Sequence, residues 1–291
     1  MDSSRIGVVV LAHEQAAYAE RALASLLEAA GRPLEAVLVD NGSGPAVGEV
    51  FDRFETAARA RGETVRRLRF EANVGAIRGR NEAMELVESD LVVFLDSDCL
   101  ARTRRWAALL ADHLDGHKDV GIVGPKLVYP WPPYDIQCAG CEVTRSGRVI
   151  FRGRGEPIAS REFNEERNCP TLISACWLMR TSLFRDLGPL DERFNPVQFE
   201  DIDYCYRARE AGWTVAYLPG VEMYHFEGMT TTKTPGIEYN SLTARNAVKF
   251  KRKWRETIEH EGGIADRAAP AWKADVGWRP VGEVGMLPLV D

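Results

Sequence analysis

Leu91-Val92-Val93-Phe94-Leu95-Asp96-Ser97-Asp98 is the stretch of sequence that decides the fold. Its five consecutive apolar residues indicate a strand buried on both faces, which is typical of a parallel sheet covered by helices. Two aspartates follow directly where this strand ends. Because ligands bind beyond the carboxyl ends of the strands in such sheets, Asp96 and Asp98 mark a candidate binding site.

The chain before this stretch repeats the same unit. Apolar segments at 6–11, 36–39 and 65–70 read as strands, and patterns of helical period follow each of them, at 19–31, 47–60 and 76–87. This alternation predicts an α/β fold with a mostly parallel central sheet flanked by helices. After about residue 125, prolines and glycines separate shorter β-like runs, before a strand at 172–180 and helices at 181–187 and 201–212.

Composition narrows the class of protein. The 291 residues are 45% hydrophobic and 27% charged, as in an ordinary folded domain. A net charge of −6 argues against a general nucleic-acid binder, which needs clustered Lys and Arg.

The N-terminus has neither a basic leader nor a long apolar run, so a cytoplasmic protein is expected. Cys138 and Cys141 have C-x-x-C spacing, but no second pair completes a zinc site.

Polar loops follow the other predicted strands and converge on the same rim. They are Ala12-His13-Glu14, Asp40-Asn41-Gly42-Ser43 and Asn73-Val74-Gly75. The loop after the first strand lacks G-x-G-x-x-G, which dinucleotides require for close approach of their pyrophosphate. The sequence therefore excludes a nicotinamide-dependent dehydrogenase.

The acidic residues suggest metal and base chemistry. Asp96 and Asp98 are two residues apart and can share one Mn²⁺ or Mg²⁺, although a solvated turn is the plain alternative. Such an ion could neutralise a diphosphate leaving group. Asp201, near the start of a predicted helix, is the candidate general base, with helix capping as the alternative. His225 is either a packed aromatic neighbour or a third metal ligand.

Taken in order, these motifs resemble the family 2 glycosyltransferases of the GT-A fold, over residues 5–250. The matching pieces are Val8-Val9-Val10-Leu11, Val39-Asp40-Asn41-Gly42-Ser43, Asn73-Val74-Gly75 with Arg80-Asn81, Leu95-Asp96-Ser97-Asp98, Gly188-Pro189-Leu190-Asp191-Glu192-Arg193-Phe194, and Glu200-Asp201-Ile202-Asp203 with Arg207. The stretch Asp135 to Gly155 is similar to that of rhamnosyltransferase-like members. Ala12-His13-Glu14 and Asn195-Pro196 depart from the common family pattern.

The resemblance implies an inverting hexosyltransferase that moves a sugar from a nucleoside diphosphate, UDP or dTDP by preference, to an acceptor hydroxyl. Asp201 is then the base, and Asp96, Asp98 and His225 hold Mn²⁺ or Mg²⁺. The expected donor contacts are Ala12, His13, Glu14, Asp40, Asn73, Gly75, Arg80, Asp96 and Ser97, and the expected acceptor-side residues are Trp177, Glu200 and Asp203. The acceptor itself stays open between carbohydrate, lipid-linked and natural-product molecules.

The same resemblance implies a catalytic domain over residues 1–255, with a nucleotide-sugar-binding half at 1–125, an acceptor-side half at 126–255 and a tail at 256–291. Two other functions fit parts of the same sequence. Leu95-Asp96-Ser97-Asp98 also resembles the nucleophile motif of haloacid-dehalogenase-like phosphatases, and a non-catalytic nucleotide-sugar-binding protein would keep the same fold. The basic stretch at 249–255 is either a solvated helix face or a peripheral contact with an anionic membrane.

Overall fold

The computed structural model describes residues 5–228 and 238–291. Its first half alternates strands and helices as the sequence predicts: β1 Ile6–Ala12, α1 Ala16–Ala29, β2 Leu34–Asn41, α2 Pro45–Ala60, β3 Thr64–Phe70, α3 Ala76–Met84 and β4 Leu91–Asp96. Asp40, Asn41 and Asp96 were expected in loops but belong to the strands. Their backbones extend the ladders, since Asp40 is paired with both Ala12 and Arg69, and Asp96 with Leu11.

The second half is less regular. It contains β5 Cys99–Ala101, α4 Trp106–Gly116, β6 Val120–Val128, β7 Ile136–Cys138, β8 Cys141–Val143, β9 Val149–Phe151, η1 Arg161–Phe163, β10 Arg167–Asn168, β11 Cys176–Arg180, α5 Thr181–Leu187, η2 Glu192–Phe194, α6 Glu200–Glu210, β12 Thr214–His225, α7 Tyr239–Lys253, α8 Arg255–Glu261, η4 Asp266–Ala268 and η5 Val281–Glu283. The strand expected at 172–180 begins only at Cys176, and the helix expected at 201–212 ends at Glu210.

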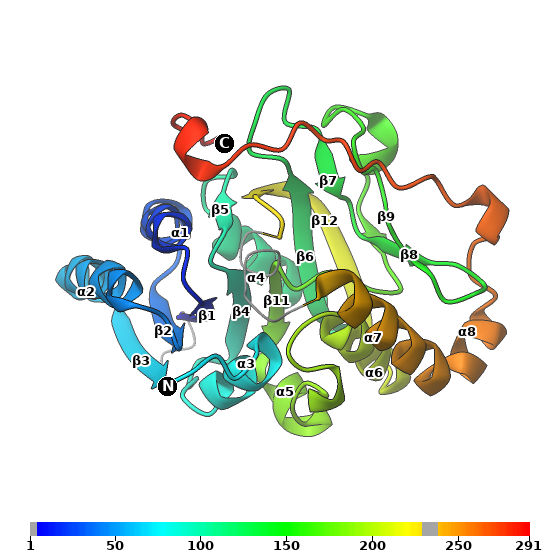
Figure 1. The fold of residues 1–291 in the computed structure, drawn as a ribbon, viewed down its shortest axis with the longest axis horizontal. Coiled ribbons are helices and arrows are strands. Elements are labelled where there is room, and N and C mark those ends of the chain that lie inside the picture. The colour runs from blue at the N-terminus through cyan, green and yellow to red at the C-terminus, as the bar shows by residue number, and fades with distance from the viewer. Residues whose placement is uncertain (1–4, 229–237) are drawn as a thin grey trace.

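One large sheet organises the molecule, with strand order β10-β12-β6-β11-β4-β1-β2-β3 (Figure 1). β3, β2, β1 and β4 are parallel to one another, and β12 is parallel to β6. β11 runs antiparallel between β4 and β6 and so joins the two parallel blocks. The predicted α/β sheet between helices is confirmed, with its parallel character concentrated in the first half.

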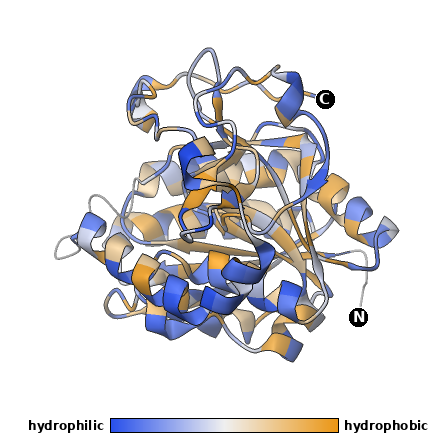
Figure 2. Cartoon of the chain, turned by 90° about the vertical axis from the view of Figure 1, so that its right-hand side faces the viewer, coloured by the Kyte–Doolittle hydropathy of each residue, from blue (hydrophilic) through white to orange (hydrophobic). Residues whose placement is uncertain are grey.

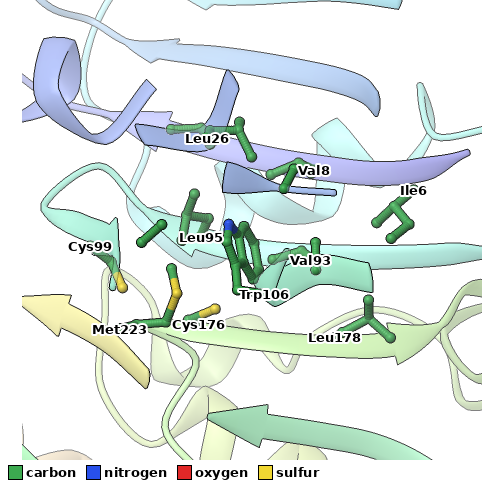
Figure 3. Close-up of a cluster of buried hydrophobic side chains, with 14 of the residues drawn as sticks. Ile6, Val8, Leu26, Val93, Leu95, Cys99, Trp106, Cys176, Leu178 and Met223 are labelled. Carbon is green, nitrogen blue, oxygen red and sulfur yellow. The ribbon is translucent and has the colours of Figure 1, made fainter. Parts of the chain in front are cut away.

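Each face of this sheet has its own hydrophobic core. Val8 and Val10 point to the face covered by α1, α2 and α4, while Val9 points to the face covered by α3, α5, α6 and α7. On the first face, the indole of Trp106 lies beside Val93 and Leu95 (Figure 3). The central strands are mainly hydrophobic and the surrounding helices are amphipathic (Figure 2), as burial on both faces of the sheet requires.

The last residues pack back over the sheet edge. A third hydrophobic cluster of Tyr18, Leu100, Val128, Tyr129, Trp131, Tyr224 and Phe226 is covered by Val276, Val281, Val284 and Leu287. The segment crosses from α8 to the neighbourhood of α1 along one side of the molecule (Figure 1). Arg21 of α1 donates hydrogen bonds to the carbonyl oxygens of Val281, Val284 and Gly285, at 3.1, 2.9 and 2.7 Å. The Val281 N–H also donates to Tyr18 Oη at 3.1 Å, and Tyr224 Oη donates to the Pro288 carbonyl oxygen at 2.9 Å. The tail is therefore held by apolar burial and by several hydrogen bonds, of which Arg21 donates three.

The basic stretch at 249–255 is partly used inside the protein. Lys253 lies 2.7 Å from a carboxylate oxygen of Asp203 and 3.1 Å from one of Asp191, and Lys249 donates to the carbonyl oxygen of Arg193. Fewer charges are thus free to face a membrane than the sequence suggests. Within residues 5–228 and 238–291, no helix combines the length and the apolar character needed to cross a bilayer.

Arg21→Ala tests how the tail is held. Loss of three hydrogen bonds, each worth about 0.5–1.5 kcal/mol net, should speed amide exchange around residues 281–290 in hydrogen-deuterium mass spectrometry. Arg53→Ala is the control, because Arg53 pairs only with Glu20 and is 57% exposed. Equal exchange in both variants would show that the Arg21 hydrogen bonds are not needed to hold the tail.

Candidate active site

Two aspartates and a histidine meet at the carboxyl end of β4. β12 pairs antiparallel with β5, which places His225 opposite Cys99 and close to the turn that carries the aspartates. Nε2 of His225 lies 3.4 Å from Oδ1 of Asp98 and 3.8 Å from Oδ2 of Asp96. One ligand atom from each of the three residues lies within 4.8 Å of the others. The structure thus brings together all three predicted metal ligands.

The electrostatics of this group favour a cation. Burial opposes a charged imidazole, but Asp98 and Asp96 outweigh burial and raise the pKa of His225 to about 10. The carboxylates therefore attract positive charge strongly enough to protonate the ring. Hard carboxylate oxygens with one imidazole suit Mn²⁺ or Mg²⁺, so the residues present fit the expected ion.

Gln137 of β7 fixes the orientation of His225, and sequence reasoning missed it. Its Oε1 lies 2.7 Å from Nδ1 of His225, and its Nε2 donates to the His225 carbonyl oxygen at 3.3 Å. A carboxamide oxygen only accepts hydrogen bonds, so Nδ1 carries the proton and Nε2 faces Asp96 and Asp98. Gln137 is fully buried, and a polar residue inside a short apolar strand was the only signal.

Arg80 of α3 joins the aspartates to the start of α6. Its guanidinium forms an ion pair with Asp96, donates to Ser174 Oγ at 2.8 Å and lies 3.5 Å from Glu200. Arg80 is only 5% exposed. Its guanidinium is therefore paired with groups of the protein and positions Asp96, which leaves little of it exposed for the predicted donor contact.

Asp201, the predicted base, lies in the first turn of α6 and is held by backbone donors. Its Oδ2 accepts from the Ser174 N–H at 3.0 Å, and its Oδ1 from the Ile202 N–H at 2.8 Å. Burial raises the pKa of Asp201 despite these hydrogen bonds. Ser174 contacts both Arg80 and Asp201, so a continuous chain of contacts links the base to Asp96.

Glu200 is the buried neighbour of the base. It is 3% exposed, and burial together with the adjacent Asp201 raises its pKa to about 8. Its Oε2 has no hydrogen-bond partner among the described residues. This burial leaves Glu200 little surface for the acceptor-side contact that the sequence predicts.

The expected donor loops form a connected rim. Asp40 accepts from the Ser43 N–H at 2.8 Å and pairs with Arg69, while Asn41 donates to Asn73 Oδ1 at 3.0 Å. Asn73 in turn accepts from the Gly75 N–H at 2.8 Å. These contacts draw the ends of β2 and β3 together, as the sequence predicted.

Gly75 and Asn195 explain one departure from the family pattern. Gly75 has a φ of 92°, and a Cβ there would come within 2.2 Å of the Asn195 side chain. Asn195 donates to the Val74 carbonyl oxygen at 2.9 Å, and the Ala76 N–H donates to that of Pro196 at 2.8 Å. The segment before α6 therefore anchors the Asn73 loop.

The first strand's loop is built differently from the prediction. Ala12 is fully buried, so it cannot contact a donor. Ser97, which follows β4, is also nearly buried at 5% exposure, so it offers little surface to a donor. His13 Nδ1 lies 2.9 Å from the Asn41 carbonyl oxygen, and Glu14 Oε1 accepts from the Gly44 N–H at 3.0 Å. The outer part of the rim therefore consists of His13 and Glu14.

Two acceptor-side expectations are corrected by burial. Trp177 is fully buried between Phe94 and Tyr204, with ring centroids 6.2 and 6.4 Å away. Asp203 is also fully buried, and it accepts from Trp254 Nε1 at 2.8 Å and pairs with Lys253. Both belong to the core because the period of their strand or helix turns them inward, away from an acceptor.

Comparison with known proteins places this site in a family. Residues 7–188 match the family described as glycosyl transferase family 2. An N-acetylglucosaminyl-diphospho-decaprenol L-rhamnosyltransferase of Mycobacterium tuberculosis is 27% identical over 299 residues, covering 96% of this chain and 90% of that protein. An uncharacterized protein of Sinorhizobium fredii is 28% identical over 227 residues, which cover 76% of this chain but only 24% of the relative.

The fold has solved counterparts. A crystal structure of GalNAc-T7 with UDP, GalNAc and Mn²⁺ superposes with a TM-score of 0.68 at 17% identity. The match covers 89% of this chain and half of that one. The structure is therefore a GT-A fold, and the chain belongs to glycosyl transferase family 2.

Proposed function

We propose that this glycosyltransferase moves a sugar from a UDP- or dTDP-linked donor to an acceptor hydroxyl with inversion, using Asp201 as the base and a cation held by Asp96, Asp98 and His225. The observation that carries the proposal is the convergence of these three ligand atoms within 4.8 Å, joined to Asp201 through Arg80 and Ser174. The complexed structure of GalNAc-T7, with its UDP and Mn²⁺, supports the choice of ligands.

Different residues act on the donor and on the acceptor in this proposal. Asp96 pairs with Arg80 and has a side chain that is 35% exposed, which supports a contact with the donor. A bound Mn²⁺ or Mg²⁺ would supply Lewis-acid stabilisation of the charge that develops on the diphosphate. Asp201 takes the proton of the acceptor hydroxyl as the hydroxyl oxygen attacks the anomeric carbon, whose bond to the diphosphate oxygen breaks so that the nucleoside diphosphate leaves. A single displacement of this kind inverts that carbon.

The site favours a transferase over a phosphatase or a non-catalytic nucleotide-sugar-binding protein. Leu95-Asp96-Ser97-Asp98 ends the fourth strand of the sheet, whereas the haloacid-dehalogenase motif follows the first strand. The family match gives that phosphatase no support. A protein that only bound nucleotide sugars would need no positioned base, yet two backbone N–H groups hold Asp201. The relative from Mycobacterium tuberculosis makes a rhamnosyl donor and a lipid-linked diphosphate acceptor the first substrates to test.

Nucleotide and metal binding are tested together by thermal stability. UDP, dTDP, GDP and CDP are each added with and without Mn²⁺, because a ligand bound only by the native state raises the midpoint. We expect UDP or dTDP with Mn²⁺ to shift the midpoint, and the same nucleotide alone to shift it less. Equal shifts with and without Mn²⁺ would contradict the metal assignment, and no shift with any nucleotide would contradict the transferase proposal.

Asp201→Asn should abolish transfer while leaving nucleotide affinity nearly intact, because the amide cannot accept the hydroxyl proton. General bases contribute about 10²- to 10⁴-fold, so kcat should fall within that range. The measurements are kcat with a sugar donor of the nucleotide that gives the largest thermal shift, and the dissociation constant of that nucleotide. Asp186→Asn, an exposed residue of α5, is the control. Turnover by Asp201→Asn at the rate of that control would end the base assignment.

Gln137→Leu should weaken Mn²⁺ binding by about 10- to 100-fold, the usual loss when the partner of a metal-binding histidine is removed. Calorimetric titration with Mn²⁺ in the absence of donor measures this directly. Gln137→Glu keeps an oxygen that accepts from Nδ1 and should retain more affinity. A folded Gln137→Leu protein with wild-type Mn²⁺ affinity would show that Gln137 does not position His225 for metal.

A further inference from the structure

A second group of metal-ligating side chains lies outside the proposed active site. His113 is in the last turn of α4 and His117 follows its end, so the two lie four residues apart on one side of the helix. Their rings stack with centroids 4.2 Å apart and planes 23° from parallel. Glu166, immediately before β10, approaches from the edge of the sheet. None of the three shares a contact with Asp96, Asp98 or His225.

His113 is the unexplained member of this group. Its side chain is only 6% exposed, and its Nε2 has no hydrogen-bond partner among the described residues. This nitrogen points toward Glu166 and lies 3.7 Å from Oε1, too far for a hydrogen bond. Leaving a buried polar nitrogen unpaired costs about 1–3 kcal/mol. A ligand between His113 and Glu166 would satisfy it.

A backbone hydrogen bond sets the tautomer of His117 that metal binding requires. Its Nδ1 lies 2.9 Å from the carbonyl oxygen of His113, which can only accept a hydrogen bond. Nδ1 therefore carries the proton, and the lone pair of the neutral ring is on Nε2. A backbone carbonyl in this position is the usual outer partner of a histidine that binds metal.

We propose that His113, His117 and Glu166 bind a zinc ion. One ligand atom from each lies within 4.8 Å of the others. Bond lengths of about 2.0–2.2 Å to zinc require these atoms to approach further and the His117 ring to turn out of its stack with His113. The exposed side chains of His117 and Glu166 permit both movements. Two imidazoles and one carboxylate form a zinc set with an open fourth position, whereas the two carboxylates of the Asp96 site suit harder cations. Bound zinc would clamp the end of α4 to the β10 edge.

Calorimetric titration of the full chain with Zn²⁺ tests the site without any transfer assay. Asp98→Asn serves as the background, because it weakens zinc binding at the other group. In that background we expect one equivalent of Zn²⁺ to bind, and His117→Ala or Glu166→Gln to lower the affinity at least 100-fold. Both residues are exposed, so neither substitution disturbs the core.

Neighbouring residues supply matched controls. Glu165→Gln removes the adjacent exposed carboxylate, and His260→Ala removes an exposed imidazole from α8. Both should bind Zn²⁺ like the background protein. Zinc affinity unchanged by His117→Ala and Glu166→Gln, or lowered equally by the controls, would overturn the proposal. If Asp98→Asn does not fold, the same variants in the wild-type chain should lose one equivalent of Zn²⁺ and keep another.

Discussion

The ion-pair network around Arg80 is the constraint on which the site depends. Asp96, Asp98, Glu200 and Asp201 gather at one edge of the sheet, where unpaired charges would be costly to bury. Arg80 is the buried cation between Asp96 and Glu200, and its hydrogen bond to Ser174 reaches the residue whose N–H holds Asp201. Removing the guanidinium would leave carboxylates facing one another in a poorly solvated space. Arg80 thus makes an acidic site compatible with a folded core.

The sheet topology explains why so many acidic groups can meet. The parallel strands β1, β2 and β4 deliver their carboxyl ends to one edge, where Asp40 and Asp96 lie. The antiparallel strand β11 then brings its own beginning to that edge, with Cys176 beside Leu95. The Ser174 N–H just before β11 is therefore available to Asp201. Finally β12, paired with β5, carries His225 to the same place.

The two proposed metal sites differ in the contacts that orient their residues. His225 is held by Gln137 and faces two carboxylates that raise its pKa. Only His117 is oriented by a hydrogen bond, to the His113 carbonyl oxygen, and His113 lies near the single carboxylate of Glu166. Carboxylate-rich groups favour Mn²⁺ or Mg²⁺, and imidazole-rich groups favour zinc. The ligand types therefore separate the two sites chemically.

By itself, the sequence determined the alternation of strands and helices and the edge of the sheet where Asp96, Asp98 and His225 come together. The role of Asp201 as the base stays a prediction. Apolar runs and helical periods are local patterns, and they predict the elements correctly because each element must bury its apolar side chains in the folded protein. Only the tertiary structure decided that Arg80 pairs within the protein, that Gln137 holds His225, and that Trp177 and Asp203 are in the core. These assignments depend on contacts between residues far apart in the chain, 88 positions for Gln137 and His225. No local pattern encodes such contacts, because burial and pairing arise when distant elements pack together.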